Sequence, residues 1–218
     1  MVLLLRIVLK ALFICHKEQL TNAVCENGHF ICDACHSYDT YAPVIAALRD
    51  STEKDALLLL EKIMDLPSVH MHGPEHHAIV PCVLLTAFRN NGEHMDYDAA
   101  LSEICKRAKQ VPGGTCGYWG VCGAAAGAGI FMSVMTGSSP LHKDAWPFPQ
   151  KLVSIILSRL ADVGGPRCCK RTSRIAIEEA VHFYSQFCSV NIPSSSITCK
   201  YCEDNRECIQ EDCPYYPE

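Results

Sequence analysis

The sequence has no surplus of positive charge. Its 19 Lys and Arg residues stand against 24 Asp and Glu residues, which gives a formal net charge of -5 at pH 7. Because Lys and Arg drive the binding of nucleic-acid phosphates, we do not expect nucleic acid to be a main partner. Hydrophobic residues make up 49% of the chain and charged residues 20%. This composition supplies a core and excludes a disordered protein.

The sequence also lacks an apolar run long enough to cross a membrane, which requires about 20 residues. Residues 1–15 are largely apolar, but Arg6 and Lys10 interrupt them and no small-residue cleavage site follows. We therefore expect a protein of a reducing, cytoplasmic compartment that does not bind membranes.

Cysteine, in contrast, is abundant: the chain has 15 cysteines and 10 histidines. Such a density indicates disulfides, metal binding or thiol chemistry. Disulfides fit least, because the number is odd and because several thiols stand in tight pairs. These pairs are Cys32 with Cys35, Cys168 with Cys169, and Cys199 with Cys202. Metal binding or thiol chemistry is the remaining prediction.

No segment alternates apolar and polar residues for long enough to predict a sheet strand. Helical periodicity dominates instead, and the predicted helices cover residues 43–49, 52–65, 77–90, 97–109, 120–136, 150–160 and 173–187. We predict a mainly α fold: a helical bundle with a small Cys/His metal knuckle at the N-terminus and a Cys-rich metal-binding tail. The predicted domains are a knuckle-like module over 1–40 and a helical domain over 41–218, whose four-cysteine tail spans 199–213.

The N-terminal cysteines lie in CENGHFICDACH, residues 25–36. The spacing C-x3-H-x2-C-x2-C is typical of loops that present ligands to zinc. The motif resembles the central part of RING and treble-clef zinc modules, which carry another C-x2-C pair upstream; here Leu12 stands at one place of that pair. One site is therefore incomplete, or another residue such as His36 substitutes, or the start of the sequence is aberrant. A set of buried free cysteines is the alternative to metal binding. The predicted metal ligands are Cys15, Cys25, His29, Cys32 and Cys35.

The tail carries four further cysteines, spaced C-x2-C-x5-C-x4-C-P. Four thiolates in so short a segment can close a tetrahedral site, and both an iron–sulfur cluster and zinc accept four cysteines. The intervening residues are mostly charged, so we do not expect the tail to fold alone. The predicted metal ligands here are Cys199, Cys202, Cys208 and Cys213, with a 4Fe-4S cluster favoured over zinc.

Two more cysteine pairs occur in CGYWGVCG and RCCKR. A Gly-rich stretch that opens a buried helix places free N–H groups beside the first pair, and neighbouring basic residues are expected to lower the thiol pKa of the second. The alternatives are close helix packing through Gly and Ala, and a basic helix start with two packed cysteines. The candidate catalytic thiols are Cys116, Cys122, Cys168 and Cys169, and the candidate cofactor-binding residues are Gly117, Gly120, Gly123, Arg167 and Arg171.

Histidines are concentrated in HMHGPEHH, residues 70–77. Imidazole and carboxylate groups together can bind a metal or transfer protons; a solvated loop is the alternative. From this segment we select His72, Glu75 and His76 as catalytic candidates.

Taken together, CENGHFICDACH, HMHGPEHH, GGTCGYWGVCGAAAGAG, GPRCCKR and the closing CKYC…C…CPYY resemble an uncharacterised domain family of anaerobic archaea and bacteria. The family occurs alone or fused to SAM-dependent methyltransferase domains. The resemblance implies work near methyl or one-carbon chemistry, with a SAM-dependent methyltransferase or a redox protein as partner.

Two classes of function stay open. In the first, the central and tail cysteines and the histidine loop converge at one end of the bundle and hold a redox-active cluster or metal that acts on a small substrate. In the second, zinc staples both ends of a non-catalytic helical module that docks on a partner such as a methyltransferase. A carrier that passes its metal to an acceptor is a third possibility.

Overall fold

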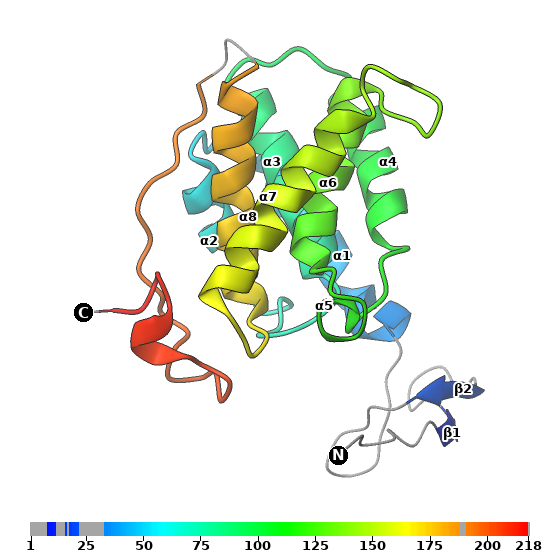
Figure 1. Cartoon of the computed structure of the whole chain (residues 1–218), viewed down its shortest axis with the longest axis vertical. Helices are drawn as coiled ribbons and strands as arrows, with labels where there is room; N and C mark the ends of the chain where they lie inside the picture. Colours follow the sequence, from blue (N-terminus) through cyan, green and yellow to red (C-terminus); the bar gives the residue numbers. More distant parts are fainter. Residues whose placement is uncertain (1–7, 12–15, 17, 22–32, 188–190, 218) are drawn as a thin grey trace.

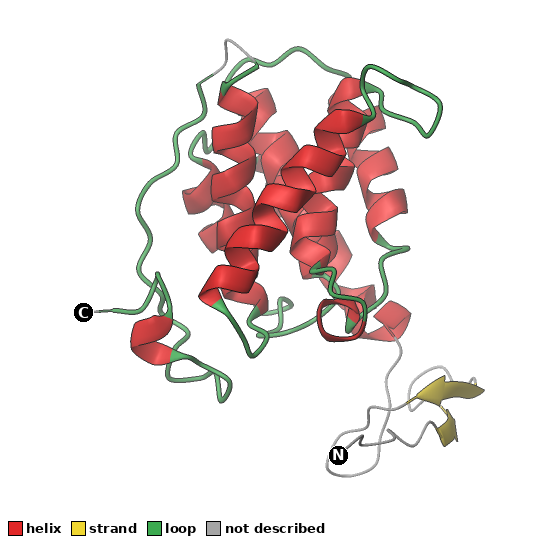
Figure 2. Ribbon diagram, in the orientation of Figure 1, coloured by secondary structure: helices red, strands yellow, loops and turns green. Residues whose placement is uncertain are grey.

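The computed structural model describes residues 8–11, 16, 18–21, 33–187 and 191–217. Within these ranges the protein is almost entirely helical, as Figure 2 shows. The elements are β1 (Val8–Ala11), β2 (Glu18–Thr21), α1 (Asp33–Asp50), α2 (Ala56–Met64), α3 (His76–Asn90), α4 (Tyr97–Ala108), α5 (Thr115–Tyr118), α6 (Gly123–Thr136), α7 (Pro147–Val163), α8 (Cys169–Ser185) and the 3-10 helix η1 (Gln210–Asp212). The predicted mainly α fold is thus confirmed, whereas a metal knuckle is not seen in the described residues.

Helix α3 is the centre of the bundle and contacts α1, α2, α4, α6 and α8 (Figure 1). Its buried residues run without a break from His76 to Phe88, as expected for a helix that is covered on all sides. Phe88 packs edge-to-face on Phe131 of α6 and Tyr184 of α8, with ring centroids 4.9 and 4.2 Å apart. These three rings join the main helices into one core.

The small residues of α6 allow it to approach α3 closely. A Cβ atom at Gly127 would lie only 2.5 Å from the carbonyl oxygen of His77, and one at Gly123 would lie 2.0 Å from Cδ2 of the same residue. Glycine is therefore required at both places for steric reasons. The close packing that the Gly- and Ala-rich sequence suggested is present in the structure.

Helix limits differ from the prediction mainly at N-termini. Helix α1 begins at Asp33, before Pro43, and α8 begins at Cys169 rather than Ser173. The segment predicted as one helix from Gly120 starts instead with the short α5, and a turn at Gly120 (φ 68°) separates it from α6. The antiparallel hairpin β1–β2 was not predicted, because strands this short show no clear alternation.

The C-terminal segment 191–217 runs along α2 and is attached at both ends of that helix. At the N-terminal end, Asp55 accepts hydrogen bonds from the backbone N–H and the hydroxyl of Ser195, both at 2.7 Å. At the C-terminal end, the Tyr201 hydroxyl donates to Asp65 at 2.6 Å. Ile192 and Tyr215 are buried against the bundle. The tail is therefore held by the helices as well as by any metal.

Three helices begin at the same end of the bundle. Gly123, at the start of α6, packs on His77 near the start of α3, and His76 lies 3.4 Å (Nδ1–Oγ) from Ser173 in the first turns of α8. Figure 1 shows this end at the bottom, with the tail beside it. Over the described ranges, every helix is too short or too polar to span a lipid bilayer.

Candidate functional site

The histidine loop 70–77 contacts both α8 and the tail. Nδ1 of His72 accepts a hydrogen bond from the backbone N–H of Cys169 at 3.5 Å. Nε2 therefore carries the proton, and it lies 3.1 Å from Oδ1 of Asn205 and 2.7 Å from Oε2 of Glu207. One imidazole thus connects three segments that are distant in sequence.

The second half of the loop is buried, whereas His70 at its start is exposed. Glu75 is fully buried and lies 3.1 Å from Nδ1 of His70, while His76 and His77 are 1% and 8% exposed. His76 Nε2–H donates to the carbonyl of His70, and His77 Nδ1–H donates to the carbonyl of Val111, both at 3.1 Å. Burial lowers the pKa of His76 to about 4, so this ring is neutral at pH 7. His70 and His72 have different partners and do not converge on one point.

Three of the candidate catalytic thiols gather at the helix starts; we call Cys116, Cys122 and Cys169 the central thiol group. Cys122 is the N-cap residue of α6, Cys169 is the first residue of α8, and Cys116 is exposed in α5. The thiol of Cys169 interacts electrostatically with Cys122, Cys168 and Cys116, and it also accepts a backbone hydrogen bond from Gly73. The predicted helix N-terminus beside the thiols is present at Cys122.

Cys168 faces the other way, toward the tail. Its Sγ accepts hydrogen bonds from Nδ2 of Asn205 at 3.5 Å and from the backbone N–H of Arg171 at 3.4 Å. Asn205 lies between Cys202 and Cys208, and its backbone carbonyl accepts from the N–H of Cys208 at 3.0 Å. Cys168 also interacts electrostatically with Cys199 and Cys213. We call Cys168 and the four tail cysteines (Cys199, Cys202, Cys208 and Cys213) the tail thiol group.

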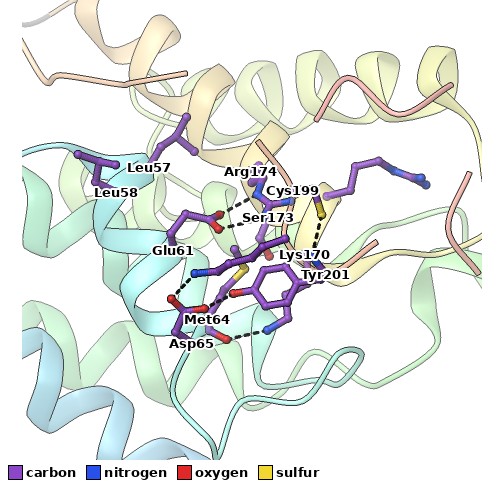
Figure 3. Close-up of polar contacts among 12 residues, drawn as sticks. Leu57, Leu58, Glu61, Met64, Asp65, Lys170, Ser173, Arg174, Cys199 and Tyr201 are labelled. Carbon is purple, nitrogen blue, oxygen red and sulfur yellow. Dashed lines mark hydrogen bonds and ion pairs between the residues drawn. The ribbon is translucent and has the colours of Figure 1, made fainter. Parts of the chain in front are cut away.

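Buried cations lie beside the tail thiol group (Figure 3). Arg174 is fully buried and makes a bidentate ion pair with Glu61 (2.7 and 2.9 Å), and its guanidinium also interacts with Cys199. Lys170 is 2% exposed, donates to the carbonyl of Met64 at 2.9 Å and lies over the ring of Tyr201. Burial lowers the pKa of Lys170 to about 8.

Among the described residues, two guanidinium nitrogens in this region have no hydrogen-bond acceptor. Arg171 is 3% exposed and uses Nη2 to hold the carbonyls of Gly164 and Pro166, at 2.9 and 2.8 Å, but its Nε makes no hydrogen bond. Nη1 of Arg174 likewise makes none. Arg167, in contrast, is more than half exposed and lies 3.9 Å from Glu207. Buried guanidinium donors without acceptors are costly, and an anion beside them would remove that cost.

The expected lowering of the thiol pKa at Cys168 and Cys169 is wrong. Burial raises the pKa of Cys168, and it raises that of Cys169 to about 12. The backbone N–H of Arg171 and its charge lower the pKa of Cys168, but desolvation of the thiolate is the larger effect. Basic neighbours in the sequence do not reveal how deeply a thiol will be buried.

The remaining site predictions have mixed outcomes. Cys15, Cys25, His29 and Cys32 lie outside the described residues, and Cys35 is in the first turn of α1 with its side chain outside the description. Gly117 is in α5 with open space around it. Among the side chains that are described, no group of three or more His, Cys, Asp or Glu is arranged to hold a metal ion.

Sequence reasoning missed Asn205 and Glu207, which connect the tail with His72 and Cys168. Their position between two predicted cysteine ligands was the available signal, but the charge of the intervening residues indicates only that the tail would not fold alone. It also missed Cys82 and Cys105, whose sulfurs lie 3.7 Å apart between α3 and α4. A groove of about 450 Å³ between α6 and α7 contains none of the predicted site residues.

Comparison with known proteins gives one match. The model of a family described as a family of unknown function, DUF5714, matches residues 44–216. No curated protein matches the chain, and no solved structure matches it. The matched residues include the histidine loop, both thiol groups and the buried cations. The chain belongs to the DUF5714 family of unknown function.

Proposed function

We propose that the cysteine-rich end of the bundle binds a thiolate-ligated metal centre, a 4Fe-4S cluster, and uses it for redox or thiol chemistry on a small substrate. One observation carries this proposal. Within the described part of the chain, the buried guanidinium groups of Arg171 and Arg174 each have a nitrogen without an acceptor, and their charges interact with Cys168 and Cys199, respectively. A metal centre held by several thiolates is an anion, and these cations would balance it.

The three helix N-termini at this end support the same proposal. The starts of α3, α6 and α8 lie together, and each start carries a partial positive charge. Cys122 and Cys168 are N-cap residues of two of these helices. Thiolates at these positions would be stabilised by the helix dipoles as well as by the buried arginines.

The residues of the chain have distinct roles in the proposed chemistry. Bound at this end, a cluster would supply electrons or an open iron position. His72 holds a proton at Nε2 between Glu207 and Asn205, next to the backbone of Cys169. Its ring is thereby fixed in orientation at the first residue of α8, and it is our candidate for proton transfer. His76, buried and neutral, positions the loop through its two hydrogen bonds.

A non-catalytic, zinc-stapled module that docks on a partner is the second candidate. Its supporting observation is the attachment of the tail to both ends of α2, through Asp55 and Asp65, which is the geometry of a staple. Tyr118 and Trp119 are 58% and 67% exposed beside Cys116 and would contact such a partner. A SAM-dependent methyltransferase is the proposed partner in either case, and zinc is the proposed metal of the N-terminal cysteines.

Anaerobic purification of the full chain separates the two candidates. We expect a brown protein whose visible absorption is bleached by dithionite, with iron and acid-labile sulfide in equal amounts. Iron and sulfide absent from a folded protein would overturn the cluster proposal. A colourless protein that contains zinc and unfolds with a chelator would support the second candidate instead.

A further inference from the structure

We propose that Cys82 of α3 and Cys105 of α4 form a redox-active dithiol that a small hydroperoxide oxidises to a disulfide. Both residues lie outside the central and tail thiol groups and take no part in the proposed metal chemistry. The inference therefore goes beyond the proposed function and does not depend on it. It gives the two sulfurs separate roles: Cys105 attacks the hydroperoxide, and Cys82 closes the disulfide.

The two sulfurs are already in contact. They lie 3.7 Å apart, at hydrogen-bonding distance for sulfur. A disulfide bond is about 2.05 Å long, so the sulfurs must approach by about 1.7 Å, which we expect rotation of the two side chains to supply. Helices α3 and α4 pack against each other (Figure 1), and the hydroxyls of Thr86 and Tyr97 join them at a second point, 2.8 Å apart. The two helices therefore hold the thiols in one place relative to each other.

The two thiols differ in their exposure to solvent. Cys82 is 1% exposed and belongs to the core of the bundle, whereas Cys105 is only partly buried. A hydroperoxide that arrives from solvent thus meets Cys105 first. Water also stabilises a thiolate better at the more exposed sulfur. In the contact between the two, the thiol of Cys82 therefore donates the hydrogen bond and the sulfur of Cys105 accepts it.

The charges around the pair favour a thiolate at Cys105. The hydrogen bond from Cys82 lowers the pKa of the Cys105 thiol; burial acts in the opposite direction, and the positive charges of Lys109 and Arg49 add to the lowering. The hydrogen bond to Cys105 and burial both raise the pKa of Cys82. Because the thiolate is the nucleophile, Cys105 is the attacking residue and Cys82 keeps its proton until the second step.

The oxidation takes two steps, written here for hydrogen peroxide. The Cys105 thiolate attacks one peroxide oxygen, the O–O bond breaks, and the leaving hydroxide takes a proton from solvent; Cys105 becomes a sulfenic acid. The sulfur of Cys82 then attacks the sulfur of Cys105, the S–O bond breaks, and the leaving hydroxide takes the Cys82 proton. The pair of thiols loses two electrons, which reduce the peroxide to water. An external dithiol restores the pair by exchange at Cys105, the accessible sulfur.

The test treats the reduced full chain with hydrogen peroxide, alkylates the remaining thiols and maps the cysteines by mass spectrometry. Trypsin places Cys82 and Cys105 in separate peptides, 63–89 and 90–106, each without another cysteine. We expect these peptides to be joined, lighter by two hydrogen atoms than their sum, and to separate after treatment with dithiothreitol. Recovery of both as alkylated free thiols, at a peroxide concentration that fully oxidises a parallel sample of glutathione, would overturn the proposal. So would sulfinic or sulfonic acids without a cross-link.

Two serine variants test the separate roles, with dimedone as the probe because it traps sulfenic acids. Cys82→Ser leaves the attacking thiol without its partner, so Cys105 should gain the label. Cys105→Ser should leave Cys82 reduced and unlabelled, because the buried thiol does not meet the oxidant. A label on Cys82 in the second variant would overturn the assigned roles. The mapping of the wild-type protein does not depend on the folding of either variant, so the cross-link itself stays testable.

Discussion

Replacing Gly127 with alanine tests how closely α3 and α6 must approach. The new Cβ would lie 2.5 Å from the backbone carbonyl oxygen of His77 and 2.8 Å from Cδ of Pro81. Carbon atoms pack best at about 3.5–4.0 Å, so the two helices would have to separate by about 1 Å. The His77 carbonyl is part of the backbone in the first turn of α3 rather than the end of a flexible side chain, so it cannot move away without moving that turn.

Two opposing effects set the size of the change in the free energy of unfolding that Gly127→Ala causes. Helix propensity alone would make Gly→Ala stabilising by about 1 kcal/mol. Overpacking a core costs about 1–3 kcal/mol, and we expect the upper end because the separation also disturbs the packing of Phe88 on Phe131. The net loss should be about 2 kcal/mol, which lowers the unfolding midpoint by about 4–8 °C in a chain of this size.

Two other glycines provide matched controls. A Cβ at Gly129 would lie 2.5 Å from the Cγ2 methyl of Val153 and at an ordinary contact distance of 3.8 Å from the carbonyl oxygen of Pro149, and one at Gly117 would meet nothing within 4 Å. Because the Val153 side chain can change rotamer, Gly129→Ala should lose less stability than Gly127→Ala, and Gly117→Ala should lose none. Urea unfolding followed by circular dichroism measures the series. A Gly127→Ala protein as stable as the wild type would refute the steric reasoning.

Three further predictions concern buried ionisable residues. Glu61→Gln leaves the guanidinium of Arg174 buried without its bidentate partner (2.7 and 2.9 Å) and should lower the free energy of unfolding by about 3 kcal/mol in urea titrations. Burial lowers the pKa of His76 to about 4, so below pH 6.5 the unfolded chain takes up a proton that the folded chain does not. Stability should therefore fall by about 3 kcal/mol between pH 6.5 and pH 4, and His76→Gln should remove that part of the pH dependence in unfolding measured across this range. Asp55→Ala removes both the cap of α2 and the anchor of Ser195, and should cost about 1–2 kcal/mol and speed proteolytic release of the tail, as followed by mass spectrometry.

Each of these three predictions has its own control or contradicting outcome. Glu103 and Arg107 make an exposed ion pair at 2.7 Å, so Glu103→Gln should leave the unfolding midpoint unchanged; equal effects at Glu61 and Glu103 would contradict the argument from burial. For His76, an unaltered pH dependence in the glutamine variant would show that other groups account for it. Asp55→Ser keeps a capping oxygen, so it should recover helix stability but not protection of the tail.

The helices could be predicted because their signals are local. Periodicity and end residues located α3, α4 and α6 within a few residues, and Pro112 and Gly137 mark real breaks. The position of the histidine loop, the central thiols and the tail at one end was a hypothesis based on loops that flank helices. In the structure, His72 of the histidine loop contacts Cys169 of α8 and Glu207 of the tail.

The other features of the candidate site could not be predicted because they depend on tertiary packing. No sequence pattern shows that Cys168 and Cys169 face different neighbours, since that follows from where α8 begins. Nor does the sequence show that Lys170 and Arg174 are buried: a basic helix start usually faces solvent, and only the tail covering it changes the outcome. The pKa values of the two thiols followed burial for the same reason.

The attachment of the tail to both ends of α2 has a consequence for the order of folding. Helix α2 has 9 residues, and an isolated helix shorter than about 12–15 residues is marginal in water. Ser195 and Tyr201, which secure its two ends, leave the ribosome more than a hundred residues later. During synthesis, α2 therefore gains the contacts that secure its two ends only after more than a hundred further residues have been translated.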